Sequence, residues 1–437
     1  MDDHRTAFIE AATWHGGLER AEAILAANPE IATSDIHTAA ILGDDVAVRR
    51  FIERDSANVT ATSEPYGGDA LTHLCLSKYL RLDPARSGAF LRAATALLDA
   101  GANPNGGFWN KGEFETALYG AAGVAHHPAL TQLLLDRGAD PNDEEVAYHS
   151  PETDDNAVIE RLVQTGKITA DNLALMLVRK HDWHDGDGAK YLLEHGADPN
   201  RRAGGRFPSA IQQAIRRDND LEIVDLLLDH GADPTRVDDG RSAVALAARR
   251  GRGDVLASMA RRGVPLAFEG VDRLIAACAM DDDAAVQSIS SREPGLVREL
   301  VAEGGALLAQ FAGTANTKGA GHLLDLGVDV AAVYEDGDGY FGVAPNSTAL
   351  HVAAWRAWHE TVRFLIERGA PIDALDGNGR TPLALAVRAC VDSYWAYRRS
   401  PESVDALLRA GASVRGVAFP SGYADVDELL RRYGATP

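Results

Sequence analysis

The stretch KHDWHDGDG at 180–188 concentrates side chains that bind metal ions. His181, Asp182 and His184 place two imidazoles and a carboxylate within four residues, a ligand set that suits zinc or iron. A tight site also needs ligands that converge from separate elements. Short polar residues with glycine are equally what a turn between two helices requires. We therefore expect a helix-to-helix turn with no resident metal, and His181, Asp182 and His184 as the ligands if a metal does bind.

Signatures of the common enzyme classes are missing from the sequence. It contains no Walker phosphate loop, no Gly-x-Ser-x-Gly, no His-Glu-x-x-His and no Cys-x-x-Cys. GDGYFG at 337–342 fits the dinucleotide pattern formally, but no strand leads into it, so we interpret it as an enlarged loop. The tripeptide Arg252-Gly253-Asp254 is assigned to a turn between helices. The sequence thus favours a non-catalytic protein over an enzyme, without deciding the matter.

Aromatic residues gather near turns and in two longer segments. Trp-His pairs occur at 14–15, 183–184 and 358–359, and the longer segments are SKYLRLDPARSGAF at 77–90 and VDSYWAYRRSPES at 391–403. Exposed aromatics are common anchors of protein interfaces, whereas the alternative is that they fill gaps in the core. Tyr394, Trp395 and Tyr397 are too close together to share one buried stripe, so at least one should be exposed. The candidate recognition residues are Trp14, Tyr79, Trp183, Trp355, Trp358, Tyr394, Trp395 and Tyr397.

A recurring phrase, LLEHGADPN at 192–200, defines the elements that position these residues. Near copies stand at 97–105, 134–142, 227–235, 365–373 and 407–415, and weaker copies at 162–170, 259–267 and 323–331. The paired leucines belong to the buried side of a helix, the glycine closes that helix in the left-handed conformation, and Asp-Pro-Asn forms a turn. Most of these glycines are 28 to 42 residues apart, and the 64-residue step from Gly263 to Gly327 contains a missing copy near 291–299. A period of about 33 residues predicts a turn and two helices per repeat.

The other half of each repeat opens with segments such as STALHVAA at 347, GRTPLALAV at 379 and GRSAVALAA at 240. With the closing phrase, these segments resemble the ankyrin repeat over nearly the whole chain. The resemblance implies an all-α solenoid of about twelve repeats in a single continuous stack. The opening hydroxyl should cap the first helix of its repeat at Thr116, Ser209, Ser242, Thr348 and Thr381.

The predicted organisation has three parts. Degenerate N-terminal repeats occupy 1–68, where the closing glycine is missing, and ankyrin repeats occupy 69–419, with expanded repeats at 69–114 and 379–419. A C-terminal capping helix is expected within 420–437, over DVDELLRRYG at 425–434. Cys75, Cys278 and Cys390 each fall in a predicted first helix, where they suit small buried positions in a reducing compartment.

Composition narrows the choice of partners. The net charge of −21 argues against nucleic acid, which requires a basic surface, and leaves room for a basic or polar partner. No apolar run is long enough to span a membrane, and the acidic N-terminus does not resemble a signal peptide. We therefore expect a cytoplasmic protein, and the 37 arginines against 6 lysines suggest a bacterial source.

These features predict a non-catalytic scaffold that binds a protein partner through its concave face, without a cofactor. Loops and first helices would line that face, as the ankyrin resemblance implies. The alternative is an enzyme or small-molecule-binding protein with a pocket of Trp, Tyr, His and Asp inside the arch. A broad open groove would favour the first hypothesis, and a deep closed pocket the second.

Overall fold

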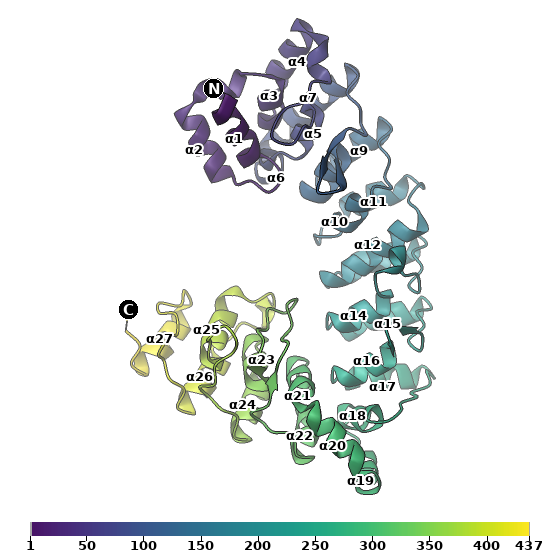
Figure 1. Ribbon diagram of the computed structural model, residues 1–437, viewed down its shortest axis with the longest axis vertical. Coiled ribbons are helices and arrows are strands. Elements are labelled where there is room, and N and C mark those ends of the chain that lie inside the picture. Colours follow the sequence, from purple (N-terminus) through teal and green to yellow (C-terminus); the bar gives the residue numbers. More distant parts are fainter. Residues whose placement is uncertain (1, 437) are drawn as a thin grey trace. The chain divides into compact units, whose positions relative to one another are not determined.

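Pairs of short helices follow one another along the chain in the computed structural model, which describes residues 2–436 (Figure 1). Contacts divide the chain into unit 1, up to Ala232, and unit 2, from Asp233. The paired helices of unit 1 are α1 (Asp2–Ala12) with α2 (Leu18–Ala27), α3 (Ile36–Leu42) with α4 (Asp45–Arg54), α5 (Ala70–Cys75) with α7 (Ser87–Asp99), α8 (Ala117–Tyr119) with α9 (Pro128–Asp136), α10 (Glu144–His149) with α11 (Ala157–Gln164), α12 (Ala170–Asp182) with α13 (Gly186–Glu194), and α14 (Ala210–Arg216) with α15 (Leu221–Asp229).

Unit 2 continues the same pattern. Its helices are α16 (Ala243–Arg249) with α17 (Gly253–Arg261), α18 (Asp272–Ala279) with α19 (Asp283–Arg292), α20 (Pro294–Ala302), α21 (Gly304–Gly313) with α22 (Thr317–Asp325), α23 (Ala349–Trp355) with α24 (His359–Glu367), α25 (Pro382–Asp392) with α26 (Glu402–Arg409), and α27 (Ala424–Arg432). The fold class predicted from the sequence, an all-α solenoid of helical hairpins, is confirmed. The single continuous stack and the three-part division of the chain stay predictions.

The few named strands in residues 2–436 pair as three antiparallel hairpins. They are β1 (Gly107–Asn110) with β2 (Glu113–Thr116), β3 (Val237–Asp238) with β4 (Arg241–Ser242), and β5 (Val333–Tyr334) with β6 (Ser347–Thr348). GDGYFG lies in the loop between β5 and β6, so its interpretation as an enlarged loop is confirmed.

Each closing phrase ends its helix as predicted, and the copies that end in asparagine also link neighbouring repeats. Gly196, which follows α13, has a φ of 94°, the left-handed region where a Cβ would be strained. The asparagine that ends the phrase donates its side-chain amide to the next repeat: Asn105 to the Gly138 carbonyl at 3.0 Å, and Asn200 to the Gly231 carbonyl at 2.8 Å. The phrase therefore fixes the spacing of successive repeats, a role that its local turn chemistry did not reveal.

First helices pack on first helices, and small residues allow the close approach. Ala353 and Ala354 of α23 are buried, and α23 packs against both α21 and α25. The side chains of Thr116, Ser242 and Thr381 accept a backbone N–H at the start of their helices, as predicted. Ser209 makes no such bond, so that prediction is wrong for α14.

Three other predicted features have a definite place in the fold. The missing phrase near 291–299 is replaced by α20, which leads directly into α21. The three cysteines lie buried in α5, α18 and α25. Helix α27 packs against α26, with Val426 and Leu430 buried, and its capping role stays a prediction. Within residues 2–436, no helix combines the length and apolarity that crossing a bilayer requires.

Candidate functional site

A groove of about 490 Å³ opens in unit 1 between the β1–β2 hairpin and the loop that leads into α10. Its volume lies within the usual range for ligand sites. The lining residues come from two consecutive repeats: Asn105, Trp109, Gly112, Glu113, Phe114, Thr116, Leu118, Asp140, Asn142, Asp143, Glu144 and Glu145. Five of these residues are acidic, two are aromatic, and none is a lysine or arginine.

The hairpin register decides which aromatic side chain faces the groove. Phe108 pairs with Glu115, and Trp109 pairs with Phe114. Because side chains alternate along a strand, Phe108 is buried while Trp109 is 72% exposed. Phe108 packs on the rings of Trp14 and Tyr66, with centroid distances of 5.6 and 5.2 Å. The hairpin is therefore anchored on the preceding repeats and presents the Trp109 indole to solvent.

The acidic wall is held by hydrogen bonds at the start of α10. Asp143 accepts the Glu145 backbone N–H at 2.8 Å and the Thr116 hydroxyl at 2.6 Å, which ties the wall to β2. Burial raises the pKa of Asp143. Glu144 accepts a hydrogen bond from Arg206, which lies in the loop before α14. The five acidic residues of the groove outnumber the two cations that contact them, Arg206 and His149.

Beyond the groove, alternating charges continue along the first helices. His149 contacts Glu145 at 3.3 Å through Nε2 and Glu152 at 3.0 Å through Nδ1. Burial opposes the positive charge of His149, but these two carboxylates overcome it and raise the pKa of His149 to about 9. Glu152 also accepts a hydrogen bond from Arg179 at 2.7 Å. His149 is thus a charged link between acids, which leaves it unsuited to act as a general base near neutral pH.

The metal-like stretch forms a turn between helices, as predicted. Helix α12 ends at Asp182 and α13 begins at Gly186. His181 contacts the Asn219 side chain at 3.2 Å, and Asp182 accepts hydrogen bonds from Arg179, Gln213 and Arg217. His184 contacts the Asn219 amide at 3.3 Å. In the part of the chain that the structure describes, no three His, Cys, Asp or Glu side chains gather as metal ligands. The absence of a resident metal stays a prediction.

Sequence reasoning missed the most consequential feature of this stretch, a buried ion pair. Lys180 is 0% exposed, and its Nζ donates to Asp185 Oδ2 at 2.6 Å and to the Thr153 carbonyl at 2.7 Å. Asp185 also accepts the Gly188 N–H at 2.8 Å and the Asn156 amide at 3.0 Å. Lys180 ends a run of apolar residues on α12, but the sequence holds no signal for which acid it meets.

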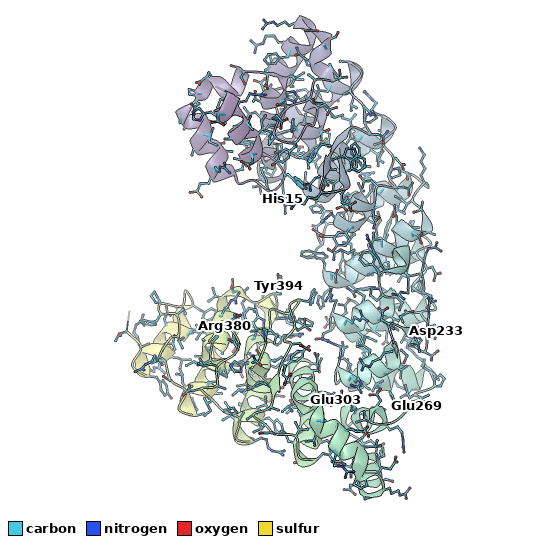
Figure 2. All side chains as sticks on the ribbon, in the orientation of Figure 1. His15, Asp233, Glu269, Glu303, Arg380 and Tyr394 are labelled. Carbon is cyan, nitrogen blue, oxygen red and sulfur yellow. The ribbon has the colours of Figure 1, made fainter. Side chains whose placement is uncertain are left out.

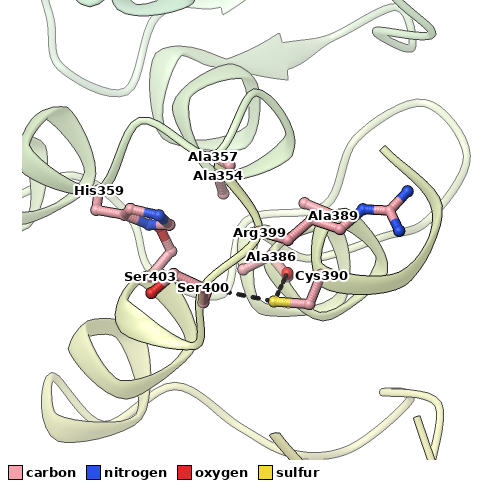
Figure 3. Close-up of a pocket in the computed structure, with 9 residues that line it drawn as sticks. All are labelled: Ala354, Ala357, His359, Ala386, Ala389, Cys390, Arg399, Ser400 and Ser403. Carbon is pink, nitrogen blue, oxygen red and sulfur yellow. Dashed lines mark hydrogen bonds between the residues drawn. The ribbon is translucent and has the colours of Figure 1, made fainter. Parts of the chain in front are cut away.

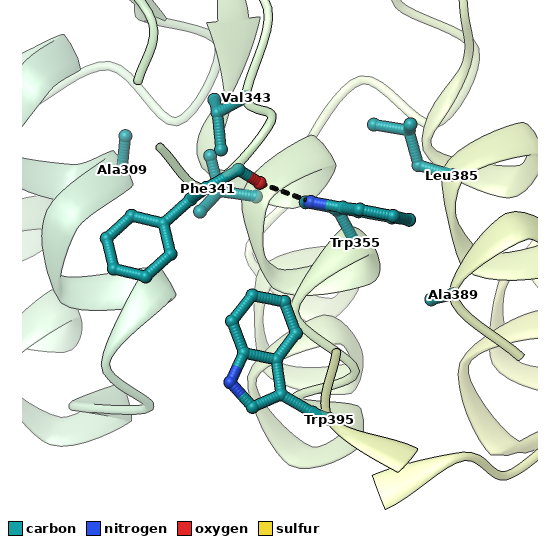
Figure 4. Close-up of a cluster of buried hydrophobic side chains, with 8 residues drawn as sticks. Ala309, Phe341, Val343, Trp355, Leu385, Ala389 and Trp395 are labelled. Atoms are coloured by element: carbon teal, nitrogen blue, oxygen red, sulfur yellow. Dashed lines mark hydrogen bonds between the residues drawn. The ribbon is translucent and has the colours of Figure 1, made fainter. Parts of the chain in front are cut away.

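Four of the eight predicted recognition residues are buried, so their assignment to an exposed surface is wrong. Trp14, Tyr79, Trp355 and Trp395 are all less than a tenth exposed. Trp355 lies under the β5–β6 loop and donates its indole N–H to the Phe341 carbonyl at 2.6 Å (Figure 4). Trp395 packs in the same buried cluster as Trp355, and Trp14 is packed by the rings of Tyr66 and Phe108.

The other four predicted residues reach solvent to different degrees. Tyr394 is 84% exposed and projects from its segment (Figure 2), and Tyr397 is 75% exposed, which confirms that at least one aromatic of this insertion is exposed. Trp183 is partly exposed and Trp358 is half-buried. Their role in recognition stays a prediction.

The three Trp-His pairs do not share one position in the turn. The left-handed residue between the paired helices is Trp14 in the first repeat, His184 after α12 and Ala357 after α23. Trp14 is itself that residue, whereas Trp183 comes one position before it and Trp358 one position after it. The three indoles therefore do not occupy equivalent positions in their repeats.

Arginine side chains stack within the aromatic cluster of unit 2. The Arg356 guanidinium lies 4.0 Å from the Phe341 ring centroid and 4.3 Å from that of Trp395. Trp355, Leu385 and further buried side chains complete the cluster (Figure 4). The cluster is a packed core that holds the β5–β6 loop and the 391–403 insertion against the first helices.

A nearby space lined by α23, α24, α25 and α26 brings His359, Ser403 and Cys390 together (Figure 3). His359 Nδ1 and Ser403 Oγ are 2.7 Å apart, as in a hydrolase pair. The space is too narrow to admit a water molecule. Burial also raises the pKa of the Cys390 thiol to about 11, which keeps it protonated and unreactive. These groups hold the insertion in place and do not form a catalytic site.

Comparisons with known proteins identify the repeats. The family model described as ankyrin repeats (3 copies) matches residues 314–416, and the model described as ankyrin repeats (many copies) matches residues 210–257. Among solved structures, the chain is similar to the human ASB11 ankyrin repeat domain, with 24% identity and a TM-score of 0.42 over 54% of this chain and 100% of that domain. No curated protein matches the sequence.

Proposed function

Because the chain is an ankyrin-repeat protein, and ankyrin repeats generally mediate contacts between proteins, we propose that it is a non-catalytic scaffold whose unit 1 binds a basic segment of a protein partner. The groove between the β1–β2 hairpin and α10 is the proposed binding site. In the ankyrin arrangement, hairpin loops and first helices line the concave face, so the proposal keeps the partner on that face.

One observation carries the proposal: an exposed indole stands beside five acidic residues in an open groove. Tryptophan is among the most frequent anchors of protein interfaces, and acidic walls accelerate and orient the approach of a basic partner. Trp109 is also presented by a hairpin that Phe108 already anchors. Binding therefore costs little conformational entropy of the hairpin.

A second contact surface is proposed in unit 2, at the exposed tyrosines of the 391–403 insertion. Tyr394 and Tyr397 are exposed, while Trp395 between them is buried and anchors the segment. The Arg398 guanidinium lies 4.9 Å from the Tyr397 ring and 3.6 Å from the Trp358 ring. Such Tyr and Arg side chains on an anchored loop are typical of interfaces.

The partner is proposed to be a protein and not a nucleic acid, since the chain carries a net charge of −21. The three buried thiols suit a reducing compartment, which keeps the cytoplasm as the proposed location. No observation in residues 2–436 favours the enzyme hypothesis, because the groove is open and the charged groups next to it are paired with one another.

The proposal is tested by selecting binders from a random peptide library displayed on phage. The wild-type chain should enrich peptides rich in Lys and Arg, and Trp109→Ser should remove that enrichment. Tyr433→Ser is the control, because Tyr433 is also an exposed aromatic residue but lies outside the groove. Thermal unfolding should be unchanged in both variants. The proposal would be contradicted if the wild-type chain enriched acidic or uncharged peptides. It would also be contradicted if Trp109→Ser enriched the same basic peptides as the wild type.

A further inference from the structure

The face that carries the groove contains one arginine site that the chain fills itself. The Arg179 guanidinium lies 4.0 Å from the Tyr148 ring centroid. Its nitrogens donate to Glu152 Oε1 at 2.7 Å and to Asp182. An aromatic face and two carboxylates thus hold a planar cation, an arrangement that suits guanidinium far better than a compact ammonium.

The groove offers the same components, and the cations that contact its carboxylates, Arg206 on Glu144 and His149 on Glu145, come from outside its lining. The rings of Trp109 and Phe114 stand 5.2 Å apart at an angle of 53°, and Asp140, Glu144 and Glu145 lie in the opposite wall. None of the lining residues is a lysine or arginine. The filled site and the groove adjoin each other, since Glu145 and Tyr148 both belong to α10.

The chain also shows that a groove carboxylate accepts a guanidinium. Arg206 reaches Glu144 from a loop 62 residues away and donates a hydrogen bond to it. Both side chains of this pair are more than half exposed, so solvent weakens it and a partner can displace it. Arg206 thereby occupies one edge of the groove and leaves the indole uncovered.

We infer that the groove selects arginine over lysine in the bound segment, an inference that rests on the proposed function. The guanidinium stacks on the Trp109 indole, and its N–H groups donate to the carboxylates of the α10 wall. Lysine satisfies the charge of the wall but cannot form the planar stack with forked hydrogen bonds. Cation–π contacts at exposed sites are individually weak, so the expected discrimination is about fivefold.

The test uses the full chain and three amidated nine-residue Gly/Ser peptides that carry three arginines, three lysines or three citrullines. Binding is measured by calorimetry and by quenching of tryptophan fluorescence at low salt. The arginine peptide should bind about fivefold more tightly than the lysine peptide, and the citrulline peptide, which lacks the charge, should not bind. Trp109→Ser should abolish the arginine preference, and Trp109→Phe should restore part of it.

The outcomes separate this inference from the proposed function. Equal affinity for the arginine and lysine peptides would refute arginine selection, but the proposed binding of a basic segment would still stand. A preference that persists in Trp109→Ser would refute the stacking contact. If neither basic peptide binds, both proposals fail. Tyr433→Ser again controls for loss of an exposed aromatic side chain elsewhere, and its affinities should equal those of the wild type.

Discussion

Replacing Lys180 with methionine should destabilise the α12–α13 repeat by about 3–5 kcal/mol. Methionine retains most of the buried stem but removes the ammonium. Asp185 would then keep its burial and lose its 2.6 Å partner, and the Thr153 carbonyl would lose its 2.7 Å donor. Two donors to Asp185 remain, the Gly188 N–H and the Asn156 amide, so the loss is large but not complete.

Hydrogen exchange detects this loss better than a single melting temperature, because repeats open locally. Amides of α12 and α13 should exchange at least about 100-fold faster, since every 1.4 kcal/mol corresponds to tenfold. Lys190→Met is the matched control: Lys190 and Glu194 are 3.9 Å apart with both side chains more than half exposed, so that change should cost no more than about 0.5 kcal/mol.

Adding Asp185→Asn to Lys180→Met should recover part of the stability. Asparagine can still cap α13, and the unpaired buried charge is gone. If Lys180→Met exchanges no faster than Lys190→Met, or if the double variant is less stable than Lys180→Met, the assignment of Lys180 and Asp185 as a structural ion pair is refuted.

The ion pair also has a pH signature. Burial opposes the charge of Asp185, but the Gly188 N–H and Lys180 overcome it and lower the pKa of Asp185 below its usual 3.8. Its contribution to stability is therefore present above pH 3.8 and is lost as the pH falls through the lower folded value. In Lys180→Met, the loss of stability on acidification should begin at a higher pH than in the wild type.

Three further predictions concern stability. Trp395→Ala should cost about 3–5 kcal/mol in chemical unfolding, because its ring is buried, whereas exposed Tyr394→Ala should change little; equal effects would contradict their assignment. Truncation after Val417 removes α27, uncovers apolar surface and should promote aggregation in light scattering; unchanged solubility and thermal stability would count against a capping role. Burial, with the charge of His37 nearby, lowers the pKa of His73 to about 3, so the protein should lose stability as the pH decreases from 6.5 towards 3. His73→Gln should flatten this pH dependence in acid titrations followed by circular dichroism. An unchanged pH dependence would refute the role of His73.

Local features of this chain could be predicted because their causes are local. The glycine of each closing phrase ends a helix through its own backbone freedom, and the next residues turn the chain without help from distant partners. The repeat period, the helical hairpins, the positions of the three cysteines and the turn at KHDWHDGDG all follow from such short-range patterns.

The groove could not be predicted, because its two walls come from different repeats. Trp109 is not among the residues predicted from the sequence, since it lies outside the recurring turn and the longer segments. Only the pairing of Trp109 with Phe114, and of Phe108 with Glu115, turns the indole outward. The extra residues between LLDAGANPN and ETALYG, which form the hairpin, are the sequence feature from which the groove could have been predicted.

The sequence alone determined that helices recur and where the helices that carry the closing phrase end, because helix closure depends on the few residues that form it. It could not determine which aromatic side chains are buried, since a loop some fourteen residues before Trp355 covers that ring. Nor could it pair Lys180 with Asp185 and the Thr153 carbonyl, which lies 27 residues away. Burial and charge pairing depend on what the neighbouring repeat brings into contact, and only the tertiary structure decides that.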